Sequence, residues 1–307
     1  MIGEFLGLIL NDVYHTFNRQ DLETRLSFTG NRRFYGIEEG SKYLVSLING
    51  NRPFCAGRYG SVECQATYKY LHKKYGIPSG SSIMPVLCNN AGFFPDNEEL
   101  LAKFGNLMLD AGRDVDFLAL LKSSFGEHFI ANYYCKKAQF TDVRTMDPIA
   151  GWTAALEGMK VLVIHPFSDT IKSQYQRREM IFPGTNLLPQ FELMTMKAVQ
   201  TAAGQKDDRF ETWFDALAYM TEEAAKLDFD IALIGCGAYG LPLAVRIKQM
   251  GRKAIHVGGS LQLLFGIRGQ RWDTRDFMQT YFNKYWVRPS ESERPKNAEN
   301  VEGACYW

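Results

Sequence analysis

The sequence lacks several patterns that mark common classes of protein. It contains no CxxC pair, and its six cysteines are scattered, several in apolar segments. Reduced thiols are therefore favoured over a disulfide framework or a zinc site. No run of lysine or arginine is present, and 35 basic against 34 acidic residues give a net charge of +1. This balance does not indicate nucleic-acid binding, so an anionic ligand should be small and locally bound.

Long apolar runs are missing as well. Residues 1–10 are apolar, but they lack a basic start and are about half the length that spans a bilayer. We interpret them as an amphipathic helix packed on a cytoplasmic protein without a transmembrane segment. HExxH, GxSxG, Walker A and protein-kinase motifs are also absent, which leaves metalloprotease, serine hydrolase and P-loop chemistry without support.

Apolar material is nevertheless abundant. Of the 307 residues, 46% are hydrophobic, with 21 Phe and 15 Tyr, enough for a substantial core. Strand-like and helical stretches alternate, regularly from residue 160 onward. Helices are expected over 37–48, 61–75, 97–111, 168–182 and 241–250, and Ser168 or Asp169 is the expected cap of the helix over 168–182. The alternation predicts an α/β fold with a doubly wound, mostly parallel, Rossmann-like sheet and helices on both faces. We expect one domain over residues 1–289 with an N-terminal helical segment, then a polar, extended or mobile tail over 290–307 whose apolar end docks back.

The most informative segment, residues 228–259, reads as a strand, a glycine loop, a helix and a second strand. Its loop has GxGxxG spacing, and free N–H groups at such a junction favour an anion such as a phosphate. A tight turn with close strand–helix packing explains the glycines equally well. NAD is disfavoured, because the second strand ends without the carboxylate that holds the ribose. The candidate phosphate-binding residues are Gly235, Gly237, Ala238, Tyr239 and Gly240.

A second glycine turn joins a predicted strand over 52–56 to a predicted helix over 61–75. Arg58 in this turn offers a fork of donors that suits a phosphate or a carboxylate, and Tyr59, Gly60 and Ser61 follow it. Ser61 also fits as a helix N-cap, and Glu63 as a first-turn carboxylate favoured by the helix dipole. That structural interpretation stands beside a ligand or catalytic role.

Two further loops have the same position after a strand. Gly258, Gly259 and Ser260 follow the last predicted strand, and Arg268, Arg271 and Trp272 come soon after. Trp272 beside basic side chains could stack a base or sugar, although a packed tryptophan is the favoured interpretation. His165 ends another predicted strand, where it could act as a general base, although a hydrogen-bonded strand end is the favoured interpretation. The carboxyl ends of parallel strands meet at one edge of a sheet, so these loops should share one crevice.

Two segments resemble a known family. PFCAGRYGSVE resembles the strand–turn motif of the bacterial GT-D glycosyltransferase-like proteins, in which an arginine and a glycine precede an Asp-x-Glu element. IALIGCGAYGLPLAVRIKQMGRKAIHVGG looks like the late strand–helix–strand unit of that family. Arg58, Gly60 and Glu63 match the motif, whereas Ser61 stands where the family has its aspartate.

The resemblance implies a GT-D-like fold and a glycosyltransferase-like function, in which a sugar moves from a nucleotide-sugar donor to an unknown acceptor during surface-polysaccharide assembly. It implies Glu63 as a catalytic residue and as the ligand of a divalent metal, Mn²⁺ or Mg²⁺. Ser61 in place of the aspartate removes one metal-binding carboxylate, and no catalytic base is assigned. The alternative is a non-catalytic, nucleotide- or phosphosugar-binding regulatory protein.

Overall fold

The centre of the protein is one parallel sheet. The computed structural model describes residues 2–17, 32–121 and 125–307, and within them eight strands pair in the order β1-β4-β3-β2-β8-β7-β5-β6. Every pairing between these strands is parallel, which confirms the predicted doubly wound α/β class. The strands are β1 (Phe34–Tyr35), β2 (Cys55–Arg58), β3 (Phe117–Leu120), β4 (Gln139–Asp142), β5 (Lys160–His165), β6 (Glu192–Lys197), β7 (Ile231–Ile234) and β8 (Lys253–His256).

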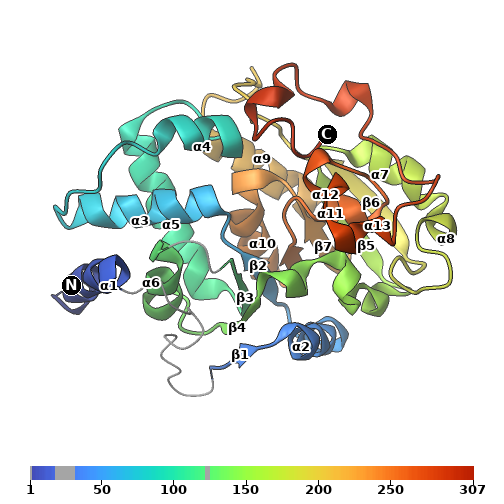
Figure 1. Cartoon of the computed structure of the whole chain (residues 1–307), viewed down its shortest axis with the longest axis horizontal. Coiled ribbons are helices and arrows are strands. Elements are labelled where there is room, and N and C mark those ends of the chain that lie inside the picture. The colour runs from blue at the N-terminus through green and yellow to red at the C-terminus, as the bar shows by residue number, and fades with distance from the viewer. Residues whose placement is uncertain (1, 18–31, 122–124) are drawn as a thin grey trace.

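Helices connect the strands and surround the sheet (Figure 1). The α-helices of the described residues are α1 (Ile2–Phe17), α2 (Ile37–Asn49), α3 (Ser61–Lys74), α4 (Met84–Ala91), α5 (Glu98–Asp114), α6 (Phe125–Tyr133), α7 (Ser168–Tyr175), α8 (Arg178–Ile181), α9 (Trp213–Ala225), α10 (Gly240–Gln249), α11 (Leu261–Leu264), α12 (Gln270–Asp273) and α13 (Asp276–Gln279). None of these helices is both long and apolar enough to cross a membrane.

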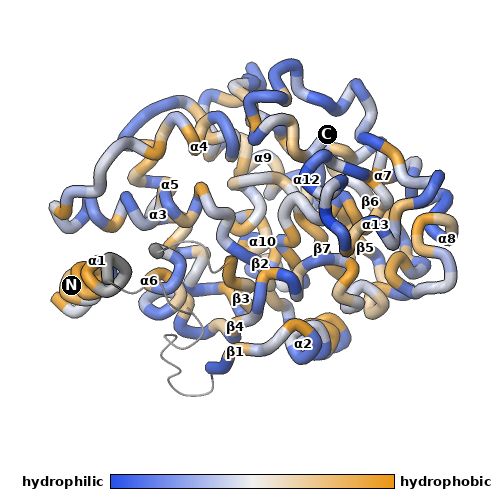
Figure 2. Tube along the Cα trace, in the orientation of Figure 1, coloured by the Kyte–Doolittle hydropathy of each residue, from blue (hydrophilic) through white to orange (hydrophobic). Residues whose placement is uncertain are grey.

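Two layers of buried side chains lie on opposite faces of the sheet. Helices α3, α4, α5, α6, α9 and α10 pack their apolar faces into the first layer. Helices α2, α7, α8, α11, α12 and α13 pack into the second. Because the central strands are covered on both faces, their sequences are continuous apolar runs, visible as hydrophobic segments at the centre of Figure 2.

Most elements expected from the sequence are present. The expected helices over 37–48, 61–75, 97–111 and 241–250 correspond to α2, α3, α5 and α10. Asn97 caps α5 by accepting from two backbone N–H groups. The single helix expected over 168–182 is wrong, since α7 and α8 are separate. The break lies between Tyr175 and Arg178, next to Gln174, whose amide donates to the carbonyls of Phe265 and Tyr285.

The amino-terminal helix packs on the domain, as expected from its amphipathic sequence. Leu8 of α1 is fully buried in the first layer. The Tyr75 hydroxyl, at the end of α3, donates to the carboxylate of Glu4. The outer face of α1 stays exposed, and the helix lies at one edge of the molecule (Figure 1).

Residues 290–307, named here the carboxy-terminal strap, fold back over the domain. The strap forms the short 3-10 helices η6 (Glu291–Glu293) and η7 (Ala298–Asn300). Val301, Ala304 and Trp307 are buried in the second layer. The expectation that the apolar end docks back is confirmed. The extended tail expected before it is wrong, because the polar stretch contains an anchor, Glu293.

Glu293 caps a helix that lies far away in the sequence. Its Oε1 accepts from the backbone N–H of Asp169 at 2.8 Å and of Thr170 at 3.4 Å, and its Oε2 accepts from the Thr170 hydroxyl. The side chain is buried at the first turn of α7, where the helix dipole favours a negative charge. The expectation that Ser168 or Asp169 caps this helix is therefore wrong: Phe167 is the N-cap, and no side chain at that position supplies the bond.

The Glu293 cap should contribute measurably to stability. Glu293→Ala leaves the first N–H groups of α7 without an acceptor and should lower the free energy of unfolding by about 1–3 kcal/mol. Urea unfolding monitored by tryptophan fluorescence measures the change. Glu291→Ala, at an exposed position of the same 3-10 helix, is the matched control and should change stability by less than about 0.5 kcal/mol. Equal effects of the two substitutions would contradict the cap.

Candidate functional site

The loops after five strands meet at one cavity. Its volume is about 180 Å³, and its wall contains residues that follow β2, β5, β6, β7 and β8. The prediction that Arg58 and Gly235 lie beside a shared crevice is confirmed. The helices that follow these strands alternate between the two layers, with α3 and α10 in the first and α11 and α7 in the second. Such reversals open a crevice at the carboxyl ends of parallel strands.

Not every candidate residue lies at this cavity. Tyr59 points into the core, where its hydroxyl donates to the carbonyl of Met108 at 2.7 Å, so the expectation that its side chain contacts a ligand is wrong. Ala238, Gly240 and Ser260 do not line the wall either. The candidates that do line it are Arg58, Gly60, Ser61, Glu63, Gly235, Gly237, Tyr239, Gly258 and Gly259.

Arg58 extends from the end of β2 across the next strand connection. A Cβ atom on Gly258 would fall 2.4 Å from one terminal nitrogen of Arg58, so the guanidinium rests directly on that glycine. Its Nε donates to the carbonyl of Val257 at 3.4 Å. Within the described ranges no carboxylate pairs with Arg58, and its terminal nitrogens remain available to an anion at the cavity.

Glu63 folds back over the turn that precedes α3. A Cβ atom on Gly60 would fall 2.0 Å from a carboxylate oxygen of Glu63, so a larger residue at that position would displace the carboxylate. Gly60 is the N-cap and Ser61 the first residue of α3, hence the expected Ser61 cap is wrong. Burial raises the pKa of Glu63, and the negative charge of Glu302 adds to this shift, while the positive charge of Arg58 opposes it.

The GxGxxG loop has structural reasons for each glycine. A Cβ on Gly235 would fall 2.7 Å from the carbonyl oxygen of Gly258, and one on Gly240 would fall 2.0 Å from the ring of His256. Gly237 has a φ of +56°, in the left-handed region that glycine adopts readily. These contacts support the interpretation of close strand–helix packing. Helix α10 has no side-chain cap, and the N–H of its first residue, Gly240, donates to the carbonyl of Gly237. The positive end of the helix dipole still favours an anion at this loop.

Two histidines at the cavity are neutral. Burial lowers the pKa of His165 to about 3, and burial together with the nearby Arg58 lowers the pKa of His256 to about 3. Nδ1 of His165 accepts the backbone N–H of Phe167 at 3.0 Å, which supports the interpretation of a hydrogen-bonded strand end. A group with so low a pKa is a weak base near neutral pH.

The carboxylates of the site do not form a closed metal shell. Across residues 2–17, 32–121 and 125–307, no three His, Cys, Asp or Glu side chains are placed to share a metal ion. Ser61 offers a hydroxyl where the GT-D motif has a carboxylate, so Glu63 stands alone in the first turn of α3. The donors present do not fit the two-carboxylate metal site, and we route no step through a metal.

Several residues at the cavity carry no local signal in the sequence. The loop after β6 contributes Val199 and Thr201, and the strap contributes Glu302, Tyr306 and Trp307. Of the later residues considered, Arg271 lines the cavity. Arg268 instead pairs with Asp273 outside it, and Trp272 is buried in the second layer. Among these residues, only those at the apolar end of the strap could be anticipated, because an apolar segment after a polar stretch tends to pack on the body of the protein.

Comparisons with known proteins give a likeness of fold. No family model matches the chain, and no curated protein matches it. A solved structure described as a selenomethionine-substituted domain of unknown function 1792 is similar, with a TM-score of 0.45 and 14% sequence identity. The alignment covers 88% of this chain and 98% of that chain.

The raised pKa of Glu63 predicts a pH-dependent stability difference. The native state holds this proton more tightly than the unfolded chain, so ionisation of Glu63 lowers the free energy of unfolding as the pH rises above the ordinary carboxyl value of 4.5. Glu63→Gln cannot ionise. Its stability relative to the unmodified protein should therefore increase between about pH 4 and pH 8, and chemical unfolding at several pH values measures the difference.

Glu99→Gln is the matched control for this experiment. Glu99 occupies the first turn of α5 but is exposed. Its substitution should give a difference that varies little across the same range, since an exposed carboxyl has no burial cost to relieve. A flat profile for Glu63→Gln would contradict the burial of an ionisable carboxyl at the cavity.

Proposed function

We propose that the cavity binds the diphosphate of a nucleotide sugar and that the protein is a glycosyltransferase that moves the sugar to an acceptor. The observation that carries the proposal is Arg58, whose guanidinium rests on Gly258 at the edge of the cavity without a carboxylate partner among the described residues. A planar fork of N–H donors matches the geometry of phosphate oxygens. A buried or half-buried arginine that served only the fold would ordinarily be paired.

The helix ends around the cavity restrict where a diphosphate fits. The N-terminus of α7 is already occupied by the carboxylate of Glu293. Helices α3 and α10 have no side-chain cap, and their N-cap residues, Gly60 and Tyr239, both line the cavity. The positive end of the helix dipole favours an anion there. We therefore place the diphosphate between Arg58 and the glycine loop of α10.

The proposed reaction breaks the bond between the sugar and the diphosphate oxygen and forms a bond from the sugar to an acceptor oxygen, whose proton must be removed. Arg58 would stabilise the negative charge that develops on the departing diphosphate. Glu63, close enough for its pKa to respond to Arg58, faces the same cavity. A cytoplasmic location and a role in surface-polysaccharide assembly are the further parts of this proposal that the GT-D resemblance supports.

One observation favours a second candidate function. Ser61 replaces the motif aspartate, and both histidines of the cavity are held neutral with a pKa of about 3. A site that retained its phosphate-binding groups but lost its acid–base groups would belong to a non-catalytic, nucleotide- or phosphosugar-binding regulatory protein. The two functions share Arg58 and differ at Glu63.

Substitution of Arg58 tests ligand binding. Arg58→Lys keeps the charge but loses the fork, so affinity for nucleoside diphosphates and nucleotide sugars should fall about tenfold, and Arg58→Ala should weaken it further. Isothermal titration calorimetry measures both, after a thermal-shift screen with and without Mn²⁺ has selected the ligand. Arg52→Lys and Arg52→Ala, at an exposed position before the same strand, are the controls and should bind normally. Unchanged affinity with a lowered melting temperature in the Arg58 variants would assign Arg58 a purely structural role.

Substitution of Glu63 separates the enzyme from the binding protein. In the enzyme, Glu63→Gln should lower the rate at which nucleoside diphosphate is released from the donor by about 10²–10⁴-fold while ligand affinity is largely kept. Glu99→Gln should release it at the normal rate. Hydrolysis of the donor, followed by chromatography, avoids the need to know the acceptor. Equal rates for Glu63→Gln and the unmodified protein would remove Glu63 from the mechanism.

A further inference from the structure

Arg271 is a second arginine at the cavity, and both of its side-chain partners come from the strap. Nη1 donates to the Tyr306 hydroxyl at 3.1 Å, and Nη2 forms an ion pair with the carboxylate of Glu302. The guanidinium also lies over the Tyr306 ring, 4.7 Å from its centroid. Arg271 is about one-third exposed, so its charge is not sealed in the core.

Arg271 and Arg58 approach the cavity over adjacent glycines. A Cβ on Gly258 would meet the Arg58 guanidinium, and a Cβ on Gly259 would fall 2.2 Å from the Tyr306 ring, on which Arg271 rests. All of these residues line the same cavity. Two guanidinium groups on one wall are a favourable arrangement for a diphosphate, which carries more than one negative charge.

Glu302 brings a carboxylate into this wall. Its backbone has a φ of +49°, in the left-handed region that non-glycine residues seldom adopt. The side chain lines the cavity and pairs with Arg271. Its charge also contributes to the raised pKa of Glu63, which places the carboxylate on the Glu63 side of the cavity.

The geometry points to Arg271 as a second diphosphate-binding arginine. Its guanidinium forms an ion pair with Glu302, so the diphosphate and Glu302 compete for the same guanidinium. This inference rests on the proposed function, because it assigns a further residue to the same diphosphate. Binding of the anion exchanges one ion pair of Arg271 for another. Loss of the ion pair between Arg271 and Glu302 costs free energy on binding and so lowers the affinity for the anion, and removal of the Glu302 charge raises that affinity.

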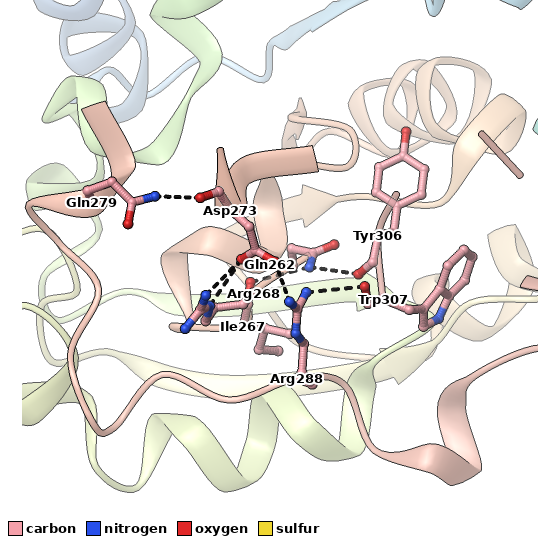
Figure 3. Close-up of polar contacts among 8 residues, drawn as sticks. All are labelled: Gln262, Ile267, Arg268, Asp273, Gln279, Arg288, Tyr306 and Trp307. Carbon is pink, nitrogen blue, oxygen red and sulfur yellow. Dashed lines mark hydrogen bonds and ion pairs between the residues drawn. The ribbon is translucent and has the colours of Figure 1, made fainter. Parts of the chain in front are cut away.

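The strap itself need not leave its place for this exchange. The side chain of Gln262 donates to the carbonyl of Tyr306 at 3.0 Å, and Arg288 donates to the carbonyl of Trp307 at 3.2 Å (Figure 3). The backbone N–H of Arg271 donates to the carbonyl of Cys305 at 2.9 Å. None of these bonds involves the side chain of Glu302, which can turn away while the strap stays docked.

Calorimetric titration with inorganic pyrophosphate tests the inference on the full chain. Glu302→Gln keeps the shape of the side chain and removes its charge, so pyrophosphate should bind about two- to fivefold more tightly, the range expected for loss of a partly exposed ion pair. Arg271→Ala should weaken binding about tenfold, and Arg271→Lys by less. Glu299→Gln is the control, because Glu299 pairs with Arg294 in the same strap but does not line the cavity, and its affinity should not change.

A double substitution decides whether Glu302 acts through Arg271. In the Arg271→Ala background, Glu302→Gln should no longer raise the affinity for pyrophosphate, since the guanidinium for which Glu302 and the anion compete is gone. The inference would be overturned by any of three results. Glu302→Gln could still raise the affinity in the Arg271→Ala background, Glu302→Gln alone could leave the affinity unchanged or lower it, or no variant could bind pyrophosphate. If pyrophosphate binds and Glu302→Gln tightens it while no nucleotide sugar binds, the inference stands and the proposed glycosyltransferase function fails.

Discussion

Burial of both faces of a parallel sheet is the constraint on which this structure depends. Parallel strands cannot be joined by tight turns, so each connection crosses a face of the sheet, and helices then cover both faces. All strands consequently end at the same edge. The cavity follows directly, because helices that alternate between the two layers leave space between the loops at that edge. The topology of the sheet is therefore sufficient to bring Arg58, Glu63 and Gly237 to one cavity.

The balance of charge at the cavity determines what it can hold. Arg58 and Arg271 supply positive charge, while Glu63 and Glu302 supply carboxylates, and the low dielectric of a half-buried wall strengthens every interaction among them. His165 and His256 add no charge to the cavity, since burial lowers the pKa of each to about 3. The carboxylates therefore govern how strongly the arginines attract an anion, whether the protein is a catalyst or a binding protein.

The features that sequence reasoning predicted correctly are those encoded locally. Buried strands appear as apolar runs, and Arg58 and Gly235 were found because each stands directly after such a run in a glycine turn. The contacts of Glu293 with Thr170 and of Glu302 with Arg271 join residues far apart in the chain. No periodic pattern in the sequence predicts such contacts. The prediction for Tyr59 failed for a related reason. Its hydroxyl stands next to a candidate arginine in the sequence, but it donates to the carbonyl of Met108 in α5, a contact between distant residues.

The pairing of β2 with β8 has a consequence for the order in which the protein can be made. Cys55 pairs with Ala254, and Arg58 reaches Val257, 199 residues further along the chain. The ribosome must therefore add 199 residues after Arg58 before Val257 exists. Until then the edge of β2 is bare, and an unpaired strand edge invites association with other chains. The arginine of the cavity is thus synthesised well before the strand that completes its surroundings.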